Sequence, residues 1–218
     1  MTAAILLTGF EPFGGEAVNP SWEIARALDG WACEGRTVRA VRLPCVFGAA
    51  LQALDAALDG AAPELVVGLG QAGGRAEISI ERVAINVDDA RIPDNRGRQP
   101  VDDAIVPAGP AAYFSTLPIK ALARAVREAG AAAAVSNTAG TFVCNHVFYA
   151  LMHRLASVPA LARTRGGFLH VPYTPDQVAG RAGVPSMALA TQVEGIRAAL
   201  AAAVRTVADV RETGGTEH

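Results

Sequence analysis

The chain has little of several features that mark other classes of protein. Its three cysteines form no CxxC pair and no even set, which argues against a disulfide scaffold and a structural zinc site. With 19 basic and 21 acidic residues, it has no basic excess for nucleic acid or an anionic membrane. No apolar run approaches the roughly 20 residues that cross a bilayer, and no signal peptide is recognisable. These absences predict a cytoplasmic protein with free thiols that binds neither nucleic acid nor membrane.

What the chain does have is enough apolar sequence for one sizeable core. Hydrophobic residues make up 51% of its 218 residues and charged residues 18%, which suits a single α/β domain. Apolar runs typical of strands alternate with segments of helical spacing. We therefore predict a single three-layer α/β/α domain with a mixed, largely parallel twisted sheet. This domain is expected to span residues 1–210, with a terminal helix over 186–210, and to be followed by a mobile polar tail at 211–218.

A cysteine at a predicted helix start is the first candidate for catalysis. Residues 131–137 form an apolar run that ends in small polar residues, and helical spacing follows from Cys144 onwards, so the pattern indicates strand, tight turn and helix. Unpaired backbone N–H groups and the helix dipole at such a position favour thiolate over thiol. Cys144 is therefore a candidate nucleophile. A buried structural cysteine is the alternative.

Two further residues stand in places where their side chains need an explanation. Glu81 lies within residues 76–86, which alternate like a strand, although glutamate has a poor strand propensity and is costly to bury unpaired. Arg82 points to the opposite face, so a distant imidazole is the expected partner; a solvated edge-strand glutamate is the alternative. His170 ends a short strand, where side chains can line a crevice, or else it is a satisfied core histidine.

A glycine-rich stretch from Gly68 to Gly74 contains a literal GxGxxG. A dinucleotide site needs a helix directly after these glycines, whereas residues 76–86 alternate as a strand. The Lys-Ser/Thr pair of a phosphate-binding loop is also missing. A nucleotide- or nucleoside-binding α/β enzyme using these glycines stays as the alternative function, and a non-catalytic binding protein as another.

Two loops look functional rather than passive. The loop after the first predicted strand holds Phe10 and Phe13 and is more apolar than a solvated loop, so these rings are expected to wall a pocket; Ser21 is the expected cap of the helix that follows. Residues 88–118 are too long and polar for a simple connection. Arg91 lies in this second loop, where a salt bridge to Asp88 or Asp89 is one alternative for its charge.

Four blocks of sequence together resemble one known family. They are TGFEPFGGEAVNPSWE from residue 8, ERVAINVDDARIPDNRGRQP from residue 81, SNTAGTFVCN from residue 136 and FLHVPYTPDQ from residue 168. In this order they resemble the pyroglutamyl peptidase I family of cysteine peptidases. The resemblance implies an exopeptidase that removes an N-terminal pyroglutamyl residue through a thioester, works without a metal or organic cofactor, and assembles as a homotetramer.

The same resemblance implies roles for individual residues. It implies a catalytic triad of Cys144, His170 and Glu81. Around the substrate it implies three phenylalanines on the faces of the ring, two amides that pair with the lactam, and an arginine close to the reacting atoms. These substrate residues are Phe10, Phe13, Phe142, Asn19, Gln71 and Arg91. Both amides could instead stabilise loops.

Overall fold

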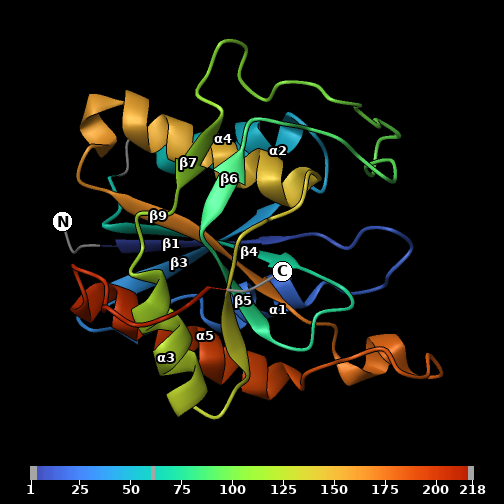
Figure 1. The fold of residues 1–218 in the computed structure, drawn as a ribbon, viewed down its shortest axis with the longest axis vertical. Coiled ribbons are helices and arrows are strands. Elements are labelled where there is room, and N and C mark those ends of the chain that lie inside the picture. Colours follow the sequence, from blue (N-terminus) through green and yellow to red (C-terminus); the bar gives the residue numbers. More distant parts are fainter. Residues whose placement is uncertain (1–3, 60–61, 216–218) are drawn as a thin grey trace.

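The computed structural model describes residues 4–59 and 62–215, and its centre is a curled seven-stranded sheet (Figure 1). The strand order is β2-β3-β1-β4-β9-β5-β8. Antiparallel pairing joins β2 to β3 and β5 to β9, and the other neighbours are parallel. The predicted mixed, largely parallel sheet is therefore confirmed. The strands are β1 (Ala4–Phe10), β2 (Ala32–Cys33), β3 (Arg36–Leu43), β4 (Leu65–Gln71), β5 (Ile78–Glu81), β8 (Ala133–Ser136) and β9 (Arg165–Val171).

Helices cover both faces of the sheet and complete the three predicted layers (Figure 1). One face carries α1 (Pro20–Ala27), α3 (Ile119–Glu128) and α5 (Leu189–Arg205), and the other carries α2 (Ala49–Leu58) and α4 (Val143–Ser157). Two short 3₁₀ turns, η1 (Pro159–Leu161) and η2 (Pro175–Val178), flank β9. All seven residues of β4 are buried, as expected for a central strand with helices above and below it. No helix within the described residues is long and apolar enough to cross a membrane.

The predicted strand over residues 76–86 is in fact two strands. Glu81 ends β5, and β6 (Val83–Ile85) pairs instead with β7 (Ala112–Phe114) in a separate two-stranded sheet. The break lies at Arg82, whose backbone N–H donates to Ser136 O at 2.8 Å while its carbonyl accepts from Ser115 N at 2.9 Å. The chain therefore changes its pairing partner at this residue. Alternation alone cannot reveal such an exchange.

Two element ends also differ from the prediction. The terminal helix, expected over 186–210, is α5 and ends at Arg205. Asn19 rather than Ser21 caps α1, because Asn19 Oδ1 accepts from Ser21 N at 3.1 Å. The Ser21 hydroxyl is used elsewhere: it accepts from Phe10 N at 3.0 Å and so joins α1 to the end of β1.

The described part of the predicted tail, residues 211–215, contacts the domain. Glu212 forms an ion pair with Arg124 of α3, with 2.5 Å between their side chains. The Gly214 carbonyl accepts from Arg82 Nη2 at 2.9 Å. Asp209, just before the tail, accepts from the first free backbone N–H groups of α3. Residues 216–218 lie outside the described part of the chain.

Candidate active site

Three neighbouring strands bring the polar candidates to one face of the sheet. In the register of β9, His170 lies opposite Gly70 of β4 on one side and Ser79 of β5 on the other. Side chains two residues apart on a strand share a face, so Glu81 and Phe168 lie on the same face as His170. Helix α4 packs over this face, and Cys144 lies in its first turn. The predicted catalytic residues thus come from β5, β9 and α4.

Glu81 and His170 form a buried pair. The Nδ1 atom of His170 lies 2.7 Å from Glu81 Oε1, and the two side chains are 4% and 0% exposed. The imidazole partner expected for Glu81 is confirmed, and the solvated edge-strand interpretation is wrong. Burial by itself would raise the pKa of Glu81, but the hydrogen bond and charge of His170, together with Ser136 and Arg75, lower it below its usual value. Glu81 is therefore a carboxylate at neutral pH.

Arg75 also binds this carboxylate, and sequence reasoning missed it. Its Nη1 lies 2.7 Å from Glu81 Oε1, and its Nη2 donates to the Thr138 carbonyl at 3.0 Å. Arg75 lies in the turn between β4 and β5, six residues before Glu81. The available signal was a cation in a glycine-rich turn close to a carboxylate that needed a partner. Alternation along a strand excludes the adjacent Arg82 as the partner of Glu81, but it says nothing about an arginine in the preceding turn.

The sulfur of Cys144 lies over Gly70 of β4, at a position where a larger residue would collide with it. A Cβ atom built on Gly70 would lie 2.7 Å from Cys144 Sγ, so the thiol occupies the space above this glycine and beside His170 on the neighbouring strand. Burial raises the pKa of the Cys144 thiol to about 12; the charge of Glu81 adds to the rise and that of Arg75 opposes it. This direction is opposite to the one expected from the helix start alone. The thiol needs a base that removes its proton during a reaction.

The GxGxxG glycines are explained by packing. A Cβ on Gly68 would overlap the Phe168 ring, and one on Gly73 would overlap the Tyr173 ring. The next element is β5, a strand, so the helix that a dinucleotide site requires does not follow. These glycines make room for aromatic rings and for the thiol of Cys144. The nucleotide alternative is not supported.

A cavity of about 300 Å³ lies at this end of the sheet. Four residues predicted for the substrate site line it, namely Phe13, Gln71, Arg91 and Phe142, together with Gly14, Glu16, Gly73, Ile92 and Tyr173. The rings of Phe13 and Phe142 have centroids 5.9 Å apart. Phe47 meets the Phe142 ring edge-on at 5.4 Å and supports it from behind. The cavity therefore combines aromatic side chains with one amide, one guanidinium and one carboxylate.

The two remaining substrate candidates lie beside this cavity and do not line it. Phe10 is 2% exposed and packs on Phe168 with ring centroids 6.3 Å apart. Asn19 is 1% exposed, and its amide donates to Glu11 O at 3.0 Å and accepts from Ser21. The contacts of Asn19 are those of a loop-stabilising amide. Both residues hold the loop that carries Phe13.

Of the polar groups in the cavity, Gln71 forms a hydrogen bond within the protein, whereas Arg91 forms no ion pair among the described residues. Gln71 Oε1 accepts from Gln177 Nε2 at 2.9 Å. Arg91 forms no salt bridge with Asp88 or Asp89 in the part of the chain that the structure describes. Asp88 instead binds His146, with 2.7 Å between its Oδ2 and the ring Nδ1. The alternative offered for Arg91 is therefore wrong, and its charge is available to the cavity.

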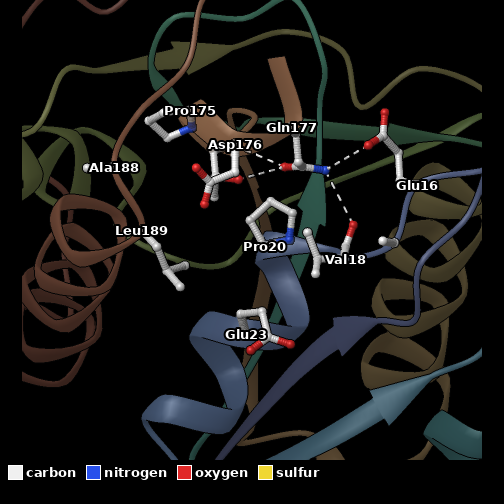
Figure 2. Close-up of a pocket in the computed structure, with 11 residues that line it drawn as sticks. Glu16, Val18, Pro20, Glu23, Pro175, Asp176, Gln177, Ala188 and Leu189 are labelled. Carbon is white, nitrogen blue, oxygen red and sulfur yellow. Dashed lines mark hydrogen bonds between the residues drawn. The ribbon is translucent and has the colours of Figure 1, made fainter. Parts of the chain in front are cut away.

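A larger cavity, of about 680 Å³, lies next to the first one and contains none of the predicted site residues (Figure 2). It is bordered by residues 16–20, η2 and the start of α5. Glu16 lines both cavities, and Gln177 lies between them, since its amide contacts Gln71, Val18 O and Glu16. This larger cavity is therefore a neighbour of the candidate site rather than the site itself.

Metal ligands are not grouped in the part of the chain that the structure describes: no three His, Cys, Asp or Glu side chains are placed to hold an ion. His146, on the helix of Cys144, uses both ring nitrogens within the protein, since Nδ1 contacts Asp88 and Nε2 accepts from Gly48 N at 3.1 Å. The chemistry that the described side chains offer is that of a thiol, an imidazole and a carboxylate.

Comparison with known proteins gives one consistent result. A family model described as pyroglutamyl peptidase matches residues 3–206. The chain is 63% identical over 214 residues to the pyrrolidone-carboxylate peptidase of Cupriavidus taiwanensis, which covers 98% of this chain and 99% of that one. It is 58% identical to that of Klebsiella pneumoniae, over 99% of this chain and 100% of the relative. The crystal structure of pyroglutamyl peptidase I from Bacillus amyloliquefaciens is 44% identical and covers 98% of this chain and 100% of its own, with a TM-score of 0.94.

Proposed function

Because the chain belongs to the pyroglutamyl peptidase family, we propose that it is a cysteine exopeptidase that removes an N-terminal pyroglutamyl residue from peptides. The observation that supports this most directly is the position of Cys144. Its sulfur lies over Gly70, beside the hydrogen-bonded pair of His170 and Glu81. This arrangement has the three parts of a nucleophile, a base and a group that orients the base.

In the proposed reaction, Cys144 Sγ attacks the pyroglutamyl carbonyl carbon while His170 Nε2 takes the thiol proton. Glu81 accepts a hydrogen bond from Nδ1–H, which fixes the tautomer and stabilises the imidazolium that forms. The tetrahedral intermediate collapses, its C–N bond breaks, and His170 returns the proton to the leaving amine. A water molecule then attacks the thioester with His170 as base, which releases pyroglutamate and the thiol.

The developing oxyanion needs donors that are already in place. The first turn of α4 presents backbone N–H groups without partners inside the helix, and Cys144 belongs to this turn. We assign the oxyanion to these amides, with Arg91 of the adjoining cavity as an additional positive charge. Donors fixed in this way need no reorganisation during the reaction.

For the substrate ring, we propose that Phe13 and Phe142 cover its apolar faces and that Gln71 pairs with its lactam group. Phe10 and Asn19 enter the proposal as residues that hold the Phe13 loop rather than as ring contacts, because both are buried beside the cavity. A cavity of about 300 Å³ suits one small ring better than a long side chain.

The test compares kcat/KM for matched pyroglutamyl and prolyl chromogenic amides. A prolyl substrate brings a charged amine in place of the lactam N–H and leaves buried polar groups unpaired, so it should be cleaved about 10⁴-fold less efficiently. Gln71→Ala should lose most of this preference. Comparable rates on both substrates would mean that the enzyme reads only the shape of the ring, and no cleavage of either would overturn the proposed function.

Two further parts of the proposal concern the protein in the cell. We propose a cytoplasmic location, on the grounds of the free thiols, and a homotetramer, on the grounds of the family resemblance. Light scattering after size exclusion measures the assembly directly. A particle of the mass of one 22.5 kDa chain would contradict the tetramer.

A further inference from the structure

Glu81 holds its two partners in an unusual way. His170 Nδ1 and Arg75 Nη1 both lie 2.7 Å from the same oxygen, Oε1. The other oxygen, Oε2, is buried and has no hydrogen-bond partner among the described residues. A carboxylate has about four acceptor sites on two oxygens, so two donors could be spread over both. Here the cation and the imidazole share one atom.

We propose that Arg75 is a positioning residue of the catalytic site. By sharing Glu81 Oε1 with His170, it holds the carboxylate in place and reduces the electrostatic stabilisation that the carboxylate gives to protonated His170. This inference rests on the proposed function, in which His170 must be a free base before it can take the thiol proton. It adds to the triad a fourth residue, whose contact with the catalytic groups is through Glu81.

The contacts of Arg75 explain how it can fix the carboxylate. Its Nη2 donates to the Thr138 carbonyl at 3.0 Å, in the turn that leads to α4 and Cys144. One guanidinium group therefore joins the turn after β4, the carboxylate of β5 and the turn before the nucleophile. The planar fork of arginine suits this use, because its donors point in fixed directions. A lysine would offer a single charge without that geometry.

The charges around His170 set the direction of the effect. The ionisable groups facing it are Glu81 on β5, Arg75 in the preceding turn and Cys144 on α4, while the β4 residue opposite it is Gly70, which has no side chain. A bare buried carboxylate stabilises an imidazolium strongly. A second cation on the same oxygen competes with that imidazolium. Removal of the Arg75 charge should therefore keep His170 protonated up to a higher pH.

The experiment measures the titration of His170 directly. Protein with ¹³C-labelled histidine contains four imidazoles, and the His170 signal is assigned by its loss in His170→Gln. The titration is followed by NMR in a Cys144→Ala background, which removes coupling to the thiol. Arg75→Met should move the midpoint of the His170 titration up by about one pH unit, the lower end of the effect of a close charge. Arg75→Gln, which keeps a donor but no charge, should shift it in the same direction and guards against misfolding of the first variant.

Arg82→Met is the matched control. Arg82 is adjacent to Glu81 but points away from it, and it binds Asn137 Oδ1 at 2.8 Å and Gly214 O at 2.9 Å. It therefore contacts the same turn without contacting the carboxylate. Its variant should leave the His170 midpoint unchanged. An unmoved midpoint in both Arg75 variants, or an equal shift in Arg82→Met, would overturn the proposal.

A second measurement separates this inference from the proposed function. With Cys144 present, the acidic limb of the pH profile of kcat/KM on a pyroglutamyl amide should move to higher pH in Arg75→Met and stay in place in Arg82→Met. The NMR titration needs no substrate. If no pyroglutamyl amide is cleaved, the proposed function fails, and the NMR result still decides the role of Arg75.

Discussion

A fully buried carboxylate is stable at position 81 because several groups compensate its charge. His170 and Arg75 bind one oxygen, and Ser136 contributes a further favourable interaction. The thiol of Cys144 has less compensation, because burial and the charge of Glu81 both disfavour its anion and only the charge of Arg75 opposes them. At the scale of single residues, the site therefore keeps its negative charge on the carboxylate. The thiol stays protonated until a substrate is attacked.

The three cysteines should differ sharply when they are replaced. Cys144→Ala should reduce kcat/KM on a pyroglutamyl amide by about 10⁴-fold or more, because the nucleophile is lost. Cys33→Ala and Cys45→Ala should retain activity, since both side chains are buried in the core, whereas Cys144 is partly exposed at the start of α4. Iodoacetamide should inactivate the enzyme with one modified cysteine, located by mass spectrometry. Inactivation by the loss of Cys33 or Cys45 instead would refute the assignment.

His170 and Glu81 should contribute unequally. His170→Ala removes the base and should lower kcat/KM by about 10²–10⁴-fold. Glu81→Gln should cost less, because a glutamine oxygen can still accept the Nδ1–H bond that orients the ring. Steady-state kinetics on a pyroglutamyl amide measures both effects. Near-normal turnover in His170→Ala would rule out this triad.

At the scale of elements, β4 and the loop over residues 88–110 shape the site. The strand places Gly70 under the thiol, and its glycines allow Phe168 and α4 to lie close to the sheet. In the loop, the Asp94 carboxylate accepts from the backbone N–H groups of Phe47, Arg96 and Arg98. Asp94 therefore holds residues 94–98 of the loop against Phe47, and Phe47 in turn contacts the ring of Phe142.

Two glycine substitutions should separate packing from catalysis. A methyl group at Gly70 would lie 2.7 Å from Cys144 Sγ, so Gly70→Ala should displace the thiol and abolish most activity. Gly68→Ala would press only on the Phe168 ring, so it should lower the thermal stability with a smaller effect on kcat per folded molecule. Thermal melting and kcat are measured on the same preparations. Equal losses of kcat would show that both act through general misfolding.

Loss of the Asp94 carboxylate should loosen the cavity. Asp94→Ala leaves three backbone donors without a charged acceptor and should cost about 1.5–3 kcal/mol of unfolding free energy, as for a hydrogen bond to a charged group. KM should rise because Arg91 and Ile92 lie just before Asp94 in the cavity wall. Asp89→Ala, an exposed carboxylate in the same loop, is the control and should change neither value. Urea unfolding and steady-state kinetics give the two quantities, and equal effects of both variants would contradict this role.

At the scale of the whole molecule, two cores lie on the two sides of the sheet, and the charged site lies at the edge of one of them. Stability in acid should therefore depend on Glu81. Its pKa in the folded state lies below the usual 4.5, so the folded protein binds fewer protons than the unfolded chain near that pH. The stability that follows from this difference is present above about pH 4.5 and is lost as the pH falls through the folded-state pKa.

Glu81→Gln tests this linkage. The free energy of unfolding of the wild type should fall as the pH drops below about 4.5, and the variant should show a shallower fall, whatever its stability at neutral pH. Glu128→Gln, at the exposed end of α3, is the control and should keep the slope of the wild type. Denaturant unfolding at a series of pH values measures the slopes. Identical slopes in Glu81→Gln and the wild type would show that this group is not linked to acid unfolding.

The sequence by itself determined the order of most elements, because local periodicity reports which face of a helix or strand is buried. It also marked Cys144 at a helix start and Glu81 as a carboxylate in need of a partner. Its predictions were wrong where a contact from elsewhere decided the outcome. Residues 76–86 change pairing partner at Arg82, because β6 pairs with β7 rather than continuing β5.

Only the tertiary structure decided how the site is assembled and charged. Insertion of β9 between β4 and β5 brings His170 beside Glu81, 89 residues away in the chain. The order of strands depends on which faces are buried together, and no local pattern encodes it. The pKa of Cys144 likewise depends on burial and on the charges of Glu81 and Arg75, which the helix start that identified this residue does not report. Burial is a property of the assembled molecule, so no local pattern reveals it.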